Sequence, residues 1–277
     1  MLYDVEMQSK VIQQNLCTAD GTRIHYIERS GEHSANELLL LHSFASGAFL
    51  WRNLIESIPF PGRILAPDLP GNGSSSLPSQ EPTVEYYVQF LKEFCEATTI
   101  RHFIGVGVSM GSNILAAFAL KYPEKIQRLI LTNPIDDTAS LKPLWKIAAQ
   151  PVIAEMIAKL FPGSLNALGK QIAKNFYDPT WLKSDLISEW WDAFQKGEVR
   201  RWIPKALRSQ PTTIPWQNIS VPCIVVFGKN DPVVSEKFRT RLRSTLRSAQ
   251  YVELDQCGHY PHLEFPERIE ELILGGN

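Results

Sequence analysis

Ser109 lies within Gly107-Val108-Ser109-Met110-Gly111, a segment with the pattern G-x-S-x-G. The apolar run 103–108 precedes the serine, and an Ala- and Leu-rich stretch, 110–122, follows it. This order predicts a sharp turn between a buried strand and a helix, where the small flanking residues let the two elements approach closely. A serine on such a turn stands at the N-terminus of a helix, which favours developing negative charge and therefore nucleophilic chemistry. The alternative is a glycine-bounded turn in which Ser109 only caps the helix.

A serine hydroxyl becomes a nucleophile only when a base accepts its proton. His259 is the best candidate among six histidines, because it closely follows the strand-like segment 251–254. A loop after a strand can hold the imidazole over the sheet edge. We interpret His262 as a supporting or surface residue. The alternative is that His262, and not His259, is the base. A metal site built on the two histidines lacks a third ligand at a suitable spacing.

The third member of such a site is an acid that orients the imidazole and stabilises its charged form. Asp231 comes shortly after the apolar run 224–227, again at the end of a strand. Its alternative role is that of a turn residue before a proline. Asp136 and Asp137 are rival acids, because they follow another apolar run. We predict Asp231 as the acid.

Acyl transfer also needs two N–H donors directed at the developing oxyanion. We predict that one is the backbone N–H of Met110, which follows the nucleophile. The other is expected from the loop 41–47, with the Phe44 N–H as the natural donor. We interpret His42, in the same loop, as packing beneath it and bonding to the backbone.

The elements that must position these residues alternate along the chain. Short apolar runs bounded by Gly, Pro, Asn or Asp predict strands buried on both faces of a parallel sheet, and residues 11–17 and 22–29 predict a hairpin ahead of them. The runs are 38–41, 64–66, 103–106, 129–131 and 224–227, and the predicted helices are 83–97, 110–122, 233–246 and 266–274. This order favours a doubly wound α/β fold. We therefore predict a core of residues 1–134 and 216–277, interrupted by a helical cap of residues 135–215 in which several prolines break the helices.

Composition excludes several classes of protein. The 277 residues include 28 Lys+Arg and 29 Asp+Glu, so the net charge of -1 argues against a nucleic-acid-binding surface. No apolar run approaches the roughly 18 residues that span a bilayer. The first residues lack the pattern of a signal peptide, and the four cysteines form no CxxC pair, which fits reduced, buried thiols. We expect a cytoplasmic monomer or homodimer that acts on a small molecule.

Four motifs together resemble the α/β-hydrolase superfamily, in its serine-nucleophile branch with a helical cap. They are His42-Ser43-Phe44, Asp68-Leu69-Pro70-Gly71-Asn72-Gly73-Ser74, the segment 107–111, and Gly258-His259-Tyr260-Pro261-His262-Leu263-Glu264. The resemblance implies an eight-stranded, mostly parallel sheet flanked by helices, and a Ser109–Asp231–His259 triad without a metal or cofactor. The sequence departs from the family pattern at Ser43, where a glycine is usual. The serine nucleophile argues against the dehalogenase and epoxide hydrolase members, which use a carboxylate.

These observations predict a serine hydrolase that cleaves an ester or related acyl bond of a small, largely apolar substrate. The alternatives are a carbon–carbon bond hydrolase, a non-hydrolytic lyase, and a receptor that retains the triad. Six of the seven tryptophans lie between 145 and 216, in or beside the predicted cap. Our candidate substrate-contacting residues are Ser43, Trp145, Trp181, Trp190 and Tyr260.

Overall fold

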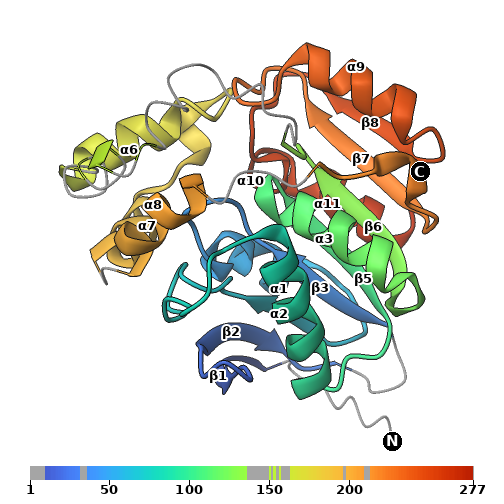
Figure 1. Cartoon of the computed structure of the whole chain (residues 1–277). Helices are drawn as coiled ribbons and strands as arrows, with labels where there is room; N and C mark the ends of the chain where they lie inside the picture. Colours follow the sequence, from blue (N-terminus) through green and yellow to red (C-terminus); the bar gives the residue numbers. More distant parts are fainter. Residues whose placement is uncertain are drawn as a thin grey trace, which may run out of the picture.

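One sheet forms the centre of the molecule. The computed structural model describes residues 10–31, 36–135, 150, 152–153, 156, 163–195, 198–208 and 213–276. Within this part of the chain, eight strands pair in the order β1-β2-β4-β3-β5-β6-β7-β8 (Figure 1). Their bounds are β1 Val11–Cys17, β2 Arg23–Arg29, β3 Glu37–Leu41, β4 Ile64–Pro67, β5 Phe103–Val108, β6 Ile126–Thr132, β7 Cys223–Gly228 and β8 Gln250–Leu254. The pairs β1–β2 and β2–β4 are antiparallel and the others are parallel, which confirms the predicted sheet.

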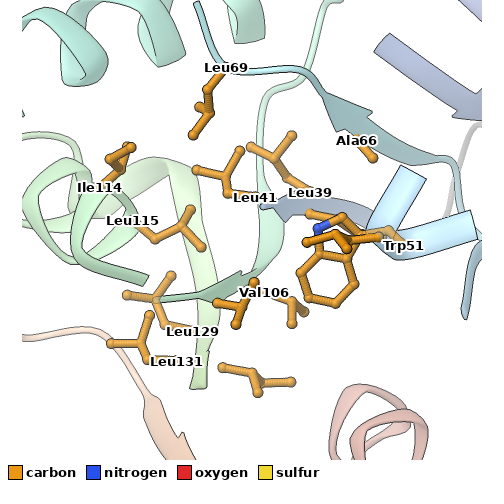
Figure 2. Close-up of a cluster of buried hydrophobic side chains, with 14 of the residues drawn as sticks. Leu39, Leu41, Trp51, Ala66, Leu69, Val106, Ile114, Leu115, Leu129 and Leu131 are labelled. Carbon is orange, nitrogen blue, oxygen red and sulfur yellow. The ribbon is translucent and has the colours of Figure 1, made fainter. Parts of the chain in front are cut away.

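The central strands are apolar because both of their faces are covered. Every residue of β4, β5 and β7 is buried, whereas β1 at the sheet edge alternates between exposed and half-buried positions. Figure 2 shows side chains of β3, β5 and β6, among them Leu41, Val106 and Leu129, packed against Leu115 and Trp51. All five of these side chains are fully buried. This continuous core holds the carboxyl ends of the parallel strands at a fixed edge.

Helices cover the sheet where the sequence predicts them, together with two short helices that it does not predict. The bounds are α1 Arg52–Ser57, α2 Val84–Ala97, α3 Met110–Lys121, α9 Glu236–Thr245, α10 Pro261–Glu264 and α11 Pro266–Leu274, and the 3₁₀ turns are η1 Ala48–Trp51, η2 Pro123–Lys125, η3 Pro179–Trp181 and η4 Trp216–Asn218. The helix α3 packs on β5 and β6, and α2 packs on α3 (Figure 1). Thr83 caps α2, because its hydroxyl accepts a hydrogen bond from the Tyr86 N–H at 3.1 Å. Of the two unpredicted helices, α1 directly follows η1, and α10 lies just before α11.

The inserted segment between β6 and β7 is helical in its described residues. They contain no strand and form α6 Leu165–Ala173, α7 Ser184–Gln195 and α8 Glu198–Arg208, which lie together to one side of the core (Figure 1). The prolines of this segment are expected to break its helices, but one of them, Pro204, lies inside α8. The neighbouring Trp202 and Ile203 are buried, so tertiary packing outweighs the backbone hydrogen bond that the proline removes. No helix in the described parts of the chain is both long and apolar enough to cross a bilayer.

Arg29 joins β2 to α1 and to the residues that follow α1. It is buried, and its guanidinium donates hydrogen bonds to the carbonyl oxygens of Ile55 at 2.9 Å, of Ile58 at 2.6 Å, and of Phe60. Burial lowers the pKa of this guanidinium, because the charged form loses hydration.

The variant Arg29→Met should therefore lower the free energy of unfolding by about 3 kcal/mol, because three buried carbonyl groups lose their donor. In a thermal melt this corresponds to a fall in Tm of roughly 6–10 °C. The matched control is Arg23→Met, an exposed arginine on the same strand, which should change Tm by less than about 2 °C. Equal melting temperatures for the two variants would show that the Arg29 contacts contribute nothing.

Candidate active site

Ser109 lies on a strained turn between β5 and α3. Its backbone angles are φ 56° and ψ -118°, a region that side chains other than glycine rarely adopt. A Cβ atom at Gly107 would lie 2.6 Å from the carbonyl carbon of Gly111, and a Cβ atom at Gly111 would lie 2.3 Å from the carbonyl oxygen of Leu41. Both positions therefore require glycine. The predicted strand–turn–helix segment is present, and it holds Ser109 at the carboxyl end of the sheet.

Asp231 and His259 form a buried pair at the ends of β7 and β8. The Oδ2 atom of Asp231 lies 2.7 Å from Nδ1 of His259. Its other oxygen, Oδ1, accepts hydrogen bonds from the backbone N–H groups of Val233 at 2.6 Å and Val234 at 3.2 Å. The carboxylate is thus fixed in orientation, and Nδ1 carries the imidazole proton. The Nε2 atom of neutral His259 is then the ring nitrogen that can accept a proton.

Asn133 links the strand ends that carry these residues. It directly follows β6 and has a positive φ of 43°, which asparagine tolerates. Its side chain accepts a hydrogen bond from the Gly228 N–H and donates one to the Gly258 carbonyl oxygen, each at 3.0 Å. The preceding residue, Thr132, accepts the Ser109 N–H at 2.9 Å. The loops that bear Asp231 and His259 are therefore bonded to one another through Asn133, a residue that the sequence does not single out, and its neighbour Thr132 bonds to Ser109. An asparagine at the end of a buried strand was the available signal.

His42 fixes the loop after β3 from below, as predicted. Its Nε2 atom accepts the Leu69 N–H at 2.8 Å, so its Nδ1 carries the proton and donates to the Ser43 carbonyl oxygen at 2.7 Å. The Ser46 hydroxyl donates to the same carbonyl oxygen at 2.8 Å. Burial lowers the pKa of His42, which keeps the ring neutral. Because C=O and N–H point in opposite directions in a trans peptide, the Phe44 N–H is directed away from these two donors.

Ser43 fits the loop without backbone strain. The positive φ in this loop, 51°, belongs to Ala45 and not to Ser43. A serine in place of the usual glycine therefore costs nothing in backbone conformation. The Ser43 hydroxyl is buried and lies 3.0 Å from the Ser46 hydroxyl, so it extends the same hydrogen-bonded group.

The variant Ser46→Ala tests this arrangement. It removes one of the two donors that hold the Ser43 carbonyl, so the Phe44 N–H becomes less well oriented. Loss of a whole oxyanion donor costs a hundredfold or more, and we expect a fall in kcat of about tenfold because His42 remains. Steady-state kinetics on a chromogenic ester measures the effect, with Ser188→Ala on the exposed face of α7 as the control. An unchanged kcat would mean that His42 alone suffices.

Two of the candidate substrate-contacting residues meet where the inserted segment packs on the core. The Trp190 indole on α7 donates a hydrogen bond to the Ala45 carbonyl oxygen at 3.2 Å. Tyr260 packs between Trp190 and Phe176, with ring centroids 5.8 and 5.1 Å apart. Burial raises the pKa of the Tyr260 hydroxyl to about 12. Both aromatic residues are almost fully buried, so they join the inserted helices to the loop 42–47 beside His259.

The remaining candidates divide into three cases. Ser43 belongs to the loop just described. Trp181 is 42 % exposed on η3, so the structure does not bring its side chain into the buried interface with Trp190 and Tyr260. Trp145, together with the rival acids Asp136 and Asp137, lies outside the described residues.

The alternative residues near His259 are not arranged for catalysis. His262 is buried rather than on the surface, and its ring lies 4.2 Å from the Trp51 ring, centroid to centroid. Burial, together with the nearby His259, lowers the pKa of His262 to about 3, so it stays neutral. Burial raises the pKa of the Cys257 thiol, which disfavours a thiolate nucleophile. Cys17 differs from the predicted buried thiols, because it is exposed on the edge strand β1.

Comparisons with known proteins agree with this architecture. Residues 36–266 match the family model described as alpha/beta hydrolase fold. The chain is 26% identical over 269 residues to a 2-hydroxy-6-oxononadienedioate/2-hydroxy-6-oxononatrienedioate hydrolase of Paraburkholderia phymatum, covering 91% of this chain and 90% of the relative. It is also 26% identical over 273 residues to a 2-hydroxy-6-oxo-6-phenylhexa-2,4-dienoate hydrolase of Comamonas testosteroni, with the same coverage. The solved structure of a thermophilic esterase from Thermogutta terrifontis superposes with a TM-score of 0.77 at 22% identity, covering 95% of this chain and 97% of that one. The chain belongs to the α/β-hydrolase fold family.

Proposed function

We propose that the protein is a serine hydrolase that cleaves an ester or related acyl bond through a Ser109–His259–Asp231 triad. The observation that carries the proposal is the buried Asp231–His259 pair, at 2.7 Å, on the sheet edge where the strained turn presents Ser109. His259 Nε2 accepts the Ser109 proton as Oγ attacks the acyl carbon, and Asp231 stabilises the resulting imidazolium. His259 then protonates the leaving group. Water hydrolyses the acyl-enzyme by the same route in reverse.

The developing oxyanion is held by two backbone N–H groups. Met110 is the first residue of α3, so its N–H has no partner within the helix. The Phe44 N–H is fixed by the peptide orientation that His42 and Ser46 impose. Both donors are placed before the reaction begins, so stabilising the charge requires little reorganisation.

The inserted segment serves as a cap that shapes the substrate site. This role is supported by the interface that Trp190 forms with Tyr260 and with the loop that carries Phe44. Phe44 also packs on Trp202 of α8, with ring centroids 4.7 Å apart. A site bounded by these aromatic side chains favours a small, largely apolar substrate.

Carbon–carbon bond hydrolysis is a second candidate, and the relatives favour it. The match covers about nine-tenths of each of the two relatives named above. Both relatives are named as hydrolases of conjugated oxo-dienoates. Such a substrate also contains an acyl carbon that a serine can attack. The same triad therefore serves either reaction, and the leaving group decides between them.

One substrate panel distinguishes these candidates. The purified protein is assayed with p-nitrophenyl esters of increasing acyl length and, in parallel, with 2-hydroxy-6-oxo-6-phenylhexa-2,4-dienoate. Faster turnover of the esters supports the esterase, and faster turnover of the dienoate supports the carbon–carbon hydrolase. Mass spectrometry of the quenched reaction should find the acyl group on Ser109 in either case. Turnover of neither substrate, without acylation, would contradict the proposal.

A further inference from the structure

Glu264 is a buried carboxylate that the proposed chemistry does not use. It ends the short helix α10 and is only 3 % exposed. Its Oε1 accepts the Gly258 N–H and its Oε2 accepts the Tyr177 N–H, each at 2.8 Å. The backbone N–H groups of Asp178 and Tyr260 also face it. Burial raises its pKa, while these backbone donors act in the opposite direction.

The donors around Glu264 come from two places in the sequence. Gly258 and Tyr260 flank His259 on either side, whereas Tyr177 and its neighbour Asp178 belong to the inserted segment. The carboxylate therefore binds the backbone directly before the imidazole and joins it to a stretch of chain more than eighty residues away.

The same two stretches are in direct contact beside the carboxylate. The His259 N–H donates to the Asn175 carbonyl oxygen at 2.7 Å. A Cβ atom at Gly258 would lie 2.3 Å from that same oxygen, so the backbones approach as closely as glycine allows. The position of His259 is thus set by contacts with the inserted segment as well as by Asp231.

The contacts require an acceptor on both oxygens of Glu264. Both oxygens of Glu264 accept hydrogen bonds from N–H donors. An amide NH₂ in place of either oxygen would face one of these donors and could not accept its hydrogen bond. Glutamine is therefore not equivalent to glutamate at this position, although it has the same shape.

We propose that Glu264 is a positioning residue for His259, which it holds by binding the Gly258 N–H next to the imidazole and anchoring this backbone to the inserted segment. This inference rests on the proposed function, in which His259 is the general base. A base displaced by a fraction of an ångström transfers a proton less efficiently. Loss of the carboxylate should therefore slow the chemical step more than it weakens substrate binding.

The test compares Glu264→Gln with wild type on whichever substrate the panel identifies. We expect kcat to fall at least tenfold while KM changes less than threefold, measured well below the Tm of the variant. In ¹⁵N-histidine-labelled protein, the proton between His259 Nδ1 and Asp231 should exchange faster with solvent. A kcat within twofold of wild type would overturn the proposal. If Glu264→Gln does not fold, Glu264→Asp, which keeps the charge but is one methylene too short to reach both Gly258 and Tyr177, is judged by the same kcat criterion.

Two controls separate positioning from stability. Glu253→Gln removes an exposed carboxylate on β8 and should leave kcat unchanged. Arg29→Met lowers stability far from His259 and should also leave kcat unchanged at 25 °C. If Arg29→Met reduces kcat as much as Glu264→Gln does, Glu264 has only a structural role. Failure of the proposed function is seen separately, as wild-type protein without turnover or acylation.

Discussion

Replacing Ser109 with alanine should reduce kcat/KM by about 10⁵-fold, to little more than the rate that the remaining groups supply. The substitution deletes the nucleophilic oxygen and leaves the oxyanion donors and the Asp231–His259 pair in place. Alanine fits the same turn as serine, so the melting temperature should stay within about 2 °C of wild type. Initial-rate assays with the best substrate of the panel measure the fall in kcat/KM. A fluorophosphonate probe, which labels activated serines, measures the loss of the nucleophile.

The matched control for this variant is Ser244→Ala, an exposed serine on α9. It should retain full activity and full labelling. Turnover by Ser109→Ala close to that of the control would refute an acyl-enzyme on Ser109. Turnover without acylation of the wild-type protein would instead favour acid–base chemistry by His259, as in a lyase. Ligand-induced stabilisation without turnover would favour a receptor.

Replacing Asp231 with asparagine should reduce kcat about 10⁴-fold, because it places the proton on the wrong nitrogen of His259. Two backbone N–H groups, from Val233 and Val234, fix the Oδ1 atom. The amide of the variant must keep its oxygen there and so present its NH₂ to Nδ1 of His259. That nitrogen then accepts a hydrogen bond, and the proton moves to Nε2, which can no longer accept one from Ser109.

The expected loss of activity is specific to Asp231, and a second aspartate serves as the control. The control Asp255→Asn changes an exposed carboxylate after β8 and should leave kcat unchanged. Histidine NMR of Asp231→Asn should show the proton on Nε2, with a Tm within a few degrees of wild type. If kcat falls less than tenfold, another acid orients His259, and Asp136 and Asp137 are the residues to replace next.

The fold could be predicted because its signals are local. Wholly apolar runs such as 224–227 occur where a strand is covered on both faces, and glycines at 107 and 111 occur where backbones nearly touch. Each of these features depends on a few neighbouring residues. An exception arises where a local preference is outweighed by contacts that are distant in the sequence. Pro204 lies within α8, because the burial of the adjacent Trp202 outweighs the proline's preference.

The candidate site could be predicted only in part, for the same reason. Residue type and position after a strand were enough to single out Ser109, Asp231 and His259. The contacts of Asn133 and Glu264 could not be predicted, because they include backbone groups far away in the sequence. The sequence does not indicate which side chain a given backbone N–H will bind.

The sequence by itself determined the chemistry that this protein has available: a serine on a glycine-bounded turn, an acid and a base each following a strand, and a tryptophan-rich insertion. Only the tertiary structure decided how those groups are held. It placed Trp190 and Tyr260 in the interface between inserted segment and core, and left Trp181 exposed. It also surrounded Glu264 with backbone donors from both sides of that interface. Burial and hydrogen-bond partners depend on which distant segments meet, and that is a property of the packed chain as a whole.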